Sequence, residues 1–301
     1  MNNNLIRDVI KKSNCKIIKY KIINKAIIYE DCNGNKFVAK KSRENNIIDT
    51  YNYLNSRGFN YLPKIIYKDE NGYIYEYEND LDIPEEEKMS DIIKIISLLH
   101  NKTSYYTDNV LDDVKILYED IKTKIDNINN YYNDLITIIE GKYFPSPSEY
   151  MLLRNCSSIF SCMNFCNNSL NKWYEIMKDK TKKRVVLLHN NLDVNHFIKS
   201  KDNLLIGWDY AKRGNPIYDF IKLYKNNYNK FNFDELYKQY NNNFPLLEEE
   251  KILLFILLFI PNKITFDNNE LLNTKKISEL CNYLYVTDNL FMKNNTEYSE
   301  E

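Results

Sequence analysis

The feature that most constrains this fold is a change of pattern near residue 80. Before it, short runs rich in Ile, Val, Tyr and Phe alternate with turn residues, as is typical of β-strands. After it, long stretches carry apolar residues at helical spacing. This order indicates an α+β protein in which a small, strand-rich part precedes a larger helical part.

The strand-rich part is expected to form an antiparallel sheet with one helix. Strands are predicted over residues 16–23, 25–31, 36–41, 64–67 and 72–77. An Asn-Gly turn at Asn33 and Gly34 joins the second strand to the third. A helix is predicted over residues 42–57, and Gly58 ends it as a C-cap residue would.

The helical part begins with a helix that Ser90 is predicted to cap. Two longer helices are predicted over residues 112–140 and 147–177. Short strand-like runs at 185–188 and 204–208 bracket a loop, and helices resume at Pro216. We therefore expect two lobes, residues 1–78 and 79–301, with a ligand cleft between them.

The balance of charge argues against some classes of partner. The chain has 41 basic and 42 acidic residues, so neither nucleic acid nor an anionic membrane is an expected partner. No secretory h-region is visible at the N-terminus, and the longest apolar run, residues 252–260, is far shorter than the roughly 20 residues of a spanning helix. Six cysteines without a secretory signal predict reduced thiols and a cytoplasmic protein.

The stretch most informative about function runs from Leu187 to Phe220. It reads Leu-Leu-His-Asn-Asn-Leu-Asp-Val-Asn-His-Phe-Ile from residue 187, Leu-Leu-Ile-Gly-Trp-Asp-Tyr-Ala from 204 and Gly-Asn-Pro-Ile-Tyr-Asp-Phe from 214. Here the sequence resembles the aminoglycoside phosphotransferase and choline kinase superfamily, most closely its CotS-like branch found among spore-coat proteins. The superfamily pattern is His-x-Asp-x-x-x-x-Asn, then Ile-Asp-Trp/Phe-Asp/Glu-Tyr-Ala, then Gly-x-Pro-x-Tyr-Asp-Leu.

Other segments match the superfamily in the same order, from about Lys16 to Tyr224. Phe37-Val38-Ala39-Lys40 resembles the third strand with its phosphate-binding lysine. Residues 53–59 and 62–66 resemble the helix and the strand that follow this third strand in the CotS-like branch. Residues 97–100 resemble the family's Leu-x-x-Leu-His helix end. The resemblance implies a bilobal protein kinase-like fold. It also implies an interlobe hinge that binds nucleotide, at Glu76, Tyr77 and Glu78.

The resemblance assigns the reactive positions of the site residue by residue. In kinase-type transfer a catalytic Asp accepts the substrate proton, while an Asn and a second Asp hold magnesium. His189 matches the histidine of the motif. Asn191 stands at the catalytic Asp position, His196 at the metal-binding Asn position and Gly207 at the metal-binding Asp position.

These replacements remove the functions that the chemistry requires. Asn191 has the shape of Asp without its charge or proton affinity, and the loss of a general base alone costs about 10²–10⁴ in rate. His196 offers nitrogen where magnesium prefers oxygen, and Gly207 offers no side chain. We therefore expect a pseudokinase, with ATP and magnesium as cofactors only if activity is retained.

Several alternatives stay open at the level of sequence. Asp193 and Asp209 could act as relocated acids, because Asp209 on a strand would share a face with Gly207. His189, Asp193, His196 and Asp209 could instead hold a transition metal, although satisfied loop residues are the simpler interpretation. Lys40 either binds a phosphate or faces solvent beside Lys41.

Three functions follow from these alternatives. The first is a non-catalytic binding or scaffold protein, whose partner is a protein or a small molecule held in the interlobe cleft. The second is an active small-molecule phosphotransferase that uses Asp193 and Asp209. The third is a changed chemistry on the same fold, such as nucleotidyl transfer, which nothing in the sequence supports directly. A spore-coat association is implied by the resemblance to the CotS-like branch alone.

Overall fold

The computed structural model describes residues 10, 17–23, 26–41 and 47–294. By proximity of the backbone, the chain forms two compact units. The first unit contains residues 1–103 and 187–213, and the second contains residues 104–186 and 214–301. The predicted lobe boundary near residue 78 stays a prediction, because this grouping follows packing within each unit and does not define a hinge.

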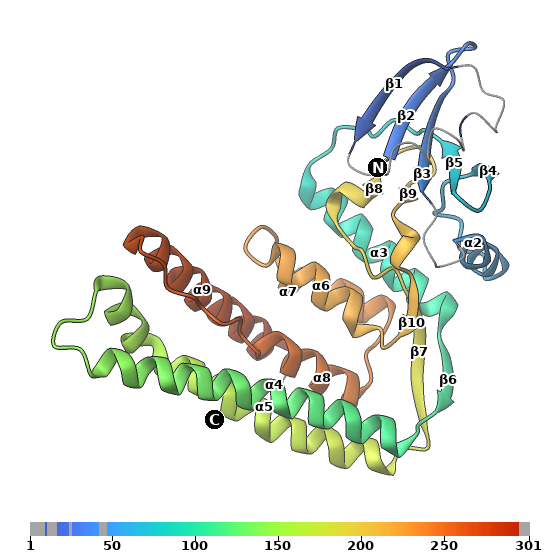
Figure 1. Ribbon diagram of the computed structural model, residues 1–301. Coiled ribbons are helices and arrows are strands. Elements are labelled where there is room, and N and C mark those ends of the chain that lie inside the picture. Colours follow the sequence, from blue (N-terminus) through green and yellow to red (C-terminus); the bar gives the residue numbers. More distant parts are fainter. Residues whose placement is uncertain (1–9, 11–16, 24–25, 42–46, 295–301) are drawn as a thin grey trace. The chain divides into compact units, whose positions relative to one another are not determined.

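The first unit is built on an antiparallel sheet, with strands in the order β1-β2-β3-β5-β4 (Figure 1). The strands are β1 (Ile17–Ile23), β2 (Ala26–Asp31), β3 (Lys36–Lys41), β4 (Ile65–Lys68) and β5 (Gly72–Glu76). Ile27, Tyr29, Ala39 and Ile74 form a buried core beneath it with Ile10. The five predicted strands are confirmed within the described residues, and the predicted ends at residues 16 and 25 lie outside them.

Turn chemistry places the first helix as the sequence predicts. Helix α2 (Ile47–Ser56) ends at Gly58, whose φ of 68° is the left-handed conformation that glycine adopts without strain. The Gly34 turn between β2 and β3 also has a positive φ, of 81°. Residues 42–46 of the predicted helix lie outside the described residues.

Helix α3 (Glu85–Thr103) begins earlier than predicted, so the assignment of Ser90 as its N-cap is wrong. The carbonyl of Pro84 accepts hydrogen bonds from the backbone N–H groups of Glu87 and Lys88, at 3.1 Å each. Three glutamates follow in the first turn, where the helix dipole favours negative charge. The Pro84 hydrogen bonds and the three glutamates therefore allow the helix to begin at Glu85, several residues before the first residues of the apolar pattern.

The predicted strand over residues 204–208 is also wrong beyond its second residue. Strand β9 (Leu204–Leu205) pairs with β8 (Phe197–Ile198) and stops there. Gly207 then adopts a left-handed conformation, and residues 208–210 form the short 3₁₀ helix η2 (Trp208–Tyr210). Period-2 alternation therefore does not apply at Asp209, and the argument that it shares a strand face with Gly207 fails.

The second unit is dominated by helices. Helix α4 (Leu111–Glu140) packs against α5 (Pro147–Asp179) as a long hairpin (Figure 1). Ser146 caps α5, with its hydroxyl accepting from the N–H of Glu149 while the Glu149 side chain accepts from the N–H of Ser146. The remaining helices are α6 (Ile217–Asn227), α7 (Phe233–Asn243), α8 (Glu248–Phe259) and α9 (Glu270–Asn294).

Short strands accompany these helices. Strand β6 (Tyr105–Asp108) pairs antiparallel with the first residues of β7 (Lys182–Leu188), from which the chain passes into the first unit. It returns through β10 (Lys212–Gly214). The apolar run at residues 252–260 lies in and just after α8 and is mostly buried. Across the described ranges, no helix is long and apolar enough to cross a bilayer.

A buried ion pair ties β7 to α8 in the second unit. The guanidinium of Arg184 binds both carboxylate oxygens of Glu250, with Nε 3.0 Å from Oε1. The side chains expose 10% and 2% of their surface, and the guanidinium lies 4.1 Å from the centre of the Phe244 ring. The Glu250 carboxylate also accepts from the N–H of Leu247 at the start of α8. The Glu250 carboxylate thus binds Arg184 on β7 and also accepts a hydrogen bond from the backbone at the start of α8.

Glu250→Ala should strongly destabilise the protein, because it leaves the Arg184 charge buried without a partner. We expect a loss of about 3–5 kcal/mol in the free energy of unfolding, measured by guanidinium denaturation. Glu248→Ala is the matched control in the same helical turn. Its pair with Lys172 is exposed, so the loss should stay below about 1 kcal/mol. Equal losses for the two variants would contradict this account.

Candidate functional site

Three sequence positions singled out for phosphoryl transfer lie together in the first unit. The Nδ1 of His196 donates to the backbone carbonyl of Asn191 at 2.7 Å. The side-chain amide of Asn191 donates to the carbonyl of Gly207 at 3.4 Å. A Cβ atom added at Gly207 would lie 3.2 Å from the Asn191 amide nitrogen and 3.3 Å from the His196 ring. Residues 191, 196 and 207 therefore form one cluster, in which Asn191 is hydrogen-bonded to both of the others and the His196 ring lies close to Gly207.

Local structure places His196 in this cluster. Asp193 caps the 3₁₀ helix η1 (Val194–His196), and its Oδ1 accepts from the backbone N–H and the side-chain amide of Asn195, at 2.9 and 2.7 Å. The N–H of Ile206 then donates to the carbonyl of His196 at 2.8 Å. Asp193 is therefore a cap residue, which the sequence analysis did not foresee when it considered this acid as a replacement base.

Glycine fits position 207 for two reasons: the backbone there is left-handed, and there is little room for a side chain. Its φ of 89° and ψ of 31° are rarely adopted by residues with a side chain. An aspartate here would combine that strain with close contact to the ring of His196. The large residue at 196 and the absent side chain at 207 are complementary, and a metal-binding aspartate does not fit without movement of both.

His189 contacts the two residues that flank Gly207, Ile206 and Trp208. It is fully buried, and its Nε2 donates to the carbonyl of Ile206 at 3.0 Å. Its ring meets Trp208 edge to face, with centroids 4.6 Å apart and planes at 76°. This geometry agrees with the expectation that His189 is a hydrogen-bonding structural residue, and it aligns the segment that carries Gly207.

Lys40 and Asp209 form a second cluster in the same unit. The Lys40 ammonium lies 3.7 Å from Oδ2 of Asp209, and the two side chains expose 18% and 14% of their surface. The hydroxyl of Tyr73 donates to Oδ1 of Asp209 at 3.0 Å. Lys40 is therefore not a solvent-facing strand lysine, and Asp209 already holds a cation and a hydroxyl.

The tyrosine in this cluster was missed by the sequence analysis. Tyr73 lies directly opposite Lys40 in the β3–β5 register, so the two side chains lie on the same face of the sheet. Burial and then the negative charge of Asp209 raise the pKa of Tyr73 well above its ordinary value. Tyr73 therefore stays protonated and acts as a donor. Only the strand register, which the turn lengths do not specify, reveals this partner.

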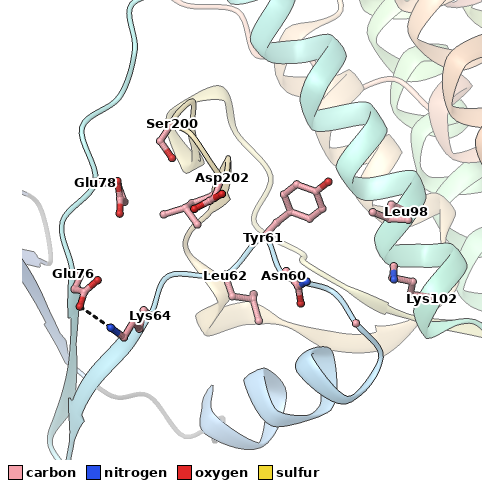
Figure 2. Close-up of a pocket in the computed structure, with 12 residues that line it drawn as sticks. Asn60, Tyr61, Leu62, Lys64, Glu76, Glu78, Leu98, Lys102, Ser200 and Asp202 are labelled. Atoms are coloured by element: carbon pink, nitrogen blue, oxygen red, sulfur yellow. Dashed lines mark hydrogen bonds and ion pairs between the residues drawn. The ribbon is translucent and has the colours of Figure 1, made fainter.

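The predicted hinge residues Glu76 and Glu78 line a pocket that is separate from the cluster of Asn191, His196 and Gly207. The N–H of Tyr77 donates to the carbonyl of Lys36 at 3.0 Å, and the carboxylate of Glu76 pairs with Lys64 at 3.1 Å. Glu76 and Glu78 line a cavity of about 660 Å³ (Figure 2). The other labelled residues around it are Asn60, Tyr61, Leu62, Lys64, Leu98, Lys102, Ser200 and Asp202. Lys40, Asn191, His196, Gly207 and Asp209 do not line this cavity.

The residues at the replaced positions do not fit a magnesium ion. Magnesium requires several oxygen ligands at near-octahedral angles, whereas these positions offer an amide, an imidazole and no side chain. The Asn191 amide nitrogen and the His196 Nδ1 are also engaged as donors. Within the described part of the chain, no three His, Cys, Asp or Glu side chains are grouped as a metal would need, so the transition-metal alternative finds no support.

Comparison with known proteins identifies the fold. No family model matches the sequence, and no curated protein matches it. Among solved structures, an aminoglycoside phosphotransferase from Alicyclobacillus acidocaldarius is similar, with a TM-score of 0.63, 10% identity and coverage of 95% of each chain. The AMP-bound spectinomycin phosphotransferase APH(9)-Ia matches with a TM-score of 0.56, 12% identity and coverage of 97% of this chain and 99% of that one.

The chain has the fold of an aminoglycoside phosphotransferase. A second structure of APH(9)-Ia, in complex with ADP and spectinomycin, also matches, with a TM-score of 0.51 and 12% identity over 97% of this chain and 98% of that one. The predicted α+β kinase-like fold is therefore confirmed. At this level of identity the comparison concerns the fold, and activity has to be argued from the residues of this chain.

Gly207→Ala should destabilise the protein, because a Cβ atom there combines a positive φ with close contact to Asn191 and His196. The left-handed conformation alone costs about 1–2 kcal/mol for a residue with a side chain, so urea denaturation should show at least that loss. Gly141→Ala is the control, since Gly141 has a φ of −70° and ordinary contacts at 3.6 Å. Its effect should lie within about 0.5 kcal/mol.

Urea denaturation of a double variant separates the backbone strain at residue 207 from the close contact with the His196 ring. Adding His196→Ala to Gly207→Ala should recover the part of the loss that comes from the ring, leaving the backbone strain. Strictly additive effects of the two substitutions would contradict the proposed complementarity of residues 196 and 207.

Proposed function

We propose that this chain is a pseudokinase, a kinase-fold protein that has lost phosphoryl transfer and acts as a binding or scaffold protein. The observation that carries the proposal is the cluster of Asn191, His196 and Gly207. The proton acceptor and both metal-binding side chains expected by resemblance are replaced there, and the replacements bond to one another. Such a site is a packed structural element, not an active site that lacks one group.

The chemistry of the cluster supports this proposal. Phosphoryl transfer relies on a base to accept the substrate proton and on metal ions to neutralise the phosphates. The side-chain amide of Asn191 accepts no proton at neutral pH and is oriented by the carbonyl of Gly207. Loss of the base costs about 10²–10⁴ in rate. Loss of the metal ligands removes most of the electrostatic stabilisation as well.

The two acids that could restore activity are already committed. Asp193 caps η1, and Asp209 holds Lys40 and the hydroxyl of Tyr73. A phosphate bound at Lys40 would compete with this carboxylate, which already compensates the lysine charge. These contacts favour the pseudokinase over an active phosphotransferase with relocated acids, which would have to release both acids from their present partners.

The partner of such a protein is a protein or a small molecule. Spectinomycin phosphotransferase has been solved with AMP and with ADP, so adenine nucleotides are the first ligands to test on this chain. The resemblance to the CotS-like branch extends the proposal to an association with the spore coat. Localisation of a fluorescent fusion during sporulation of the source cell would test that extension.

Calorimetric titration of the chain with ATP, with and without magnesium or manganese, tests the proposal. We expect the metals to leave ATP affinity unchanged and a phosphotransfer assay to show no turnover, because the cluster has no metal-binding carboxylate. Metal-dependent ATP binding together with turnover that Lys40→Ala abolishes would overturn the proposal.

Two further variants locate any activity that is found. Asp193→Ala and Asp209→Ala should each abolish turnover if relocated acids carry it. Full activity in both would exclude the relocated acids and point to a different mechanism. Glu70→Ala, which changes an exposed acid in the β4–β5 turn of the same unit and away from the cavity, controls for a general effect of charge removal.

A further inference from the structure

A second pocket lies within the second unit and shares no residue with the candidate site described above. It has a volume of about 340 Å³ and is bounded by the end of α6, the segment after α8 and one face of α9. This volume falls in the range of small-molecule sites, about 300–1,000 Å³. Three lysines from these separate elements line it: Lys225, Lys263 and Lys276.

Two of the three lysines have compensating partners. The Lys276 ammonium pairs with Asp267 at 2.5 Å and donates to the carbonyl of Thr265 at 2.8 Å. The Lys263 ammonium lies 5.0 Å from the centre of the Tyr131 ring. Lys225 differs, because the described residues provide it with neither a hydrogen bond nor an ion pair. It is therefore the cation of this pocket that lacks compensation.

The surroundings of Lys225 make its charge unfavourable. Burial lowers the pKa of Lys225 to about 8, and the positive charge of Lys124 on α4 adds to this effect. The thiol of Cys166, which faces it from α5, is itself kept neutral by burial, which raises its pKa. Glu279 on α9 is the one acid in the lining, and it forms no ion pair with Lys225. A half-buried cation without a partner among the described residues costs stability, so an incoming anion would be bound favourably.

Aromatic rings supply the apolar part of the pocket. Tyr228 and Tyr283 meet edge to face, with centroids 5.0 Å apart and planes at 89°. Their hydroxyls donate to the carbonyls of Glu279 and Leu258, at 3.3 and 2.6 Å. Both tyrosines line the cavity beside the lysines, and their hydroxyls are already bonded to the backbone.

We propose that this pocket binds a small organic anion, whose carboxylate or phosphate pairs with the Lys225 ammonium and whose apolar part lies against Tyr228 and Tyr283. The site uses none of the residues of the Asn191 cluster or of the Lys40–Asp209 pair. It therefore goes beyond the proposed pseudokinase function and does not depend on it.

Titration of the full chain at pH 7 with four probes tests the proposal: phenyl phosphate, benzoate, inorganic phosphate and neutral benzyl alcohol. We expect phenyl phosphate or benzoate to bind and raise Tm, inorganic phosphate to bind more weakly, and benzyl alcohol not to bind. The stronger of the two aromatic probes identifies the anionic group. Failure of both to bind at millimolar concentration would overturn the proposal.

Lys225→Met should reduce the affinity of the aromatic anion by roughly tenfold or more, the loss of one charge-assisted hydrogen bond. Lys230→Met, an exposed lysine just beyond α6, is the control and should keep wild-type affinity. Tyr228→Leu should weaken phenyl phosphate while leaving inorganic phosphate unchanged, which keeps the test decisive even if Lys225→Met folds poorly. Unchanged affinity in Lys225→Met would overturn the assignment.

The stability of the same variant distinguishes a ligand site from a structural lysine. Because the pKa of Lys225 falls from 10.5 to about 8 on folding, its charge opposes folding below pH 8, and this penalty disappears as the pH rises toward 10.5. Lys225→Met should therefore raise Tm at pH 7 although it abolishes binding, and the gain should vanish above pH 10. A lower Tm at pH 7 would assign Lys225 a structural role and contradict the proposal.

Discussion

The contact between the ring of His196 and the bare backbone of Gly207 governs the remainder of the candidate site. The ring lies 3.3 Å from the position that a Cβ atom at 207 would take, and its Nδ1 donates to the carbonyl of Asn191. This packing requires the left-handed backbone at Gly207, which in turn ends strand β9 and starts the short helix that carries Asp209. Gly207 thus joins the region beside the His196 ring to the short helix that carries Asp209.

The consequence reaches the sheet through Asp209. Because η2 replaces an extended strand, the Asp209 carboxylate meets Lys40 and Tyr73, which face each other across β3 and β5. The ammonium of Lys40 is thereby paired with a protein carboxylate. In both clusters, polar groups of the chain bond to one another.

Much of the fold followed from local pattern. The Asn-Gly turn, the glycine after α2 and the prolines around residue 146 mark element ends through backbone chemistry that involves only neighbouring residues. The predicted start of α3 and the predicted end of β9 were wrong because local backbone preferences there opposed the pattern of apolar residues. Pro84 and the glutamates after it began α3 before the apolar pattern did, and Gly207 interrupted a run whose composition favours a strand.

The sequence by itself determined which chemical groups stand at positions 191, 196 and 207, because an amide, an imidazole and a glycine have fixed properties wherever they lie. It also determined the fold class, through ordered motifs and periodicity. Only the tertiary structure decided that these three residues pack on one another and that Asp193 and Asp209 are already engaged. It also decided that Lys225 is half-buried and has no partner among the described residues. Those facts depend on distances between residues far apart in the chain, which strand register and helix packing establish and residue identity does not.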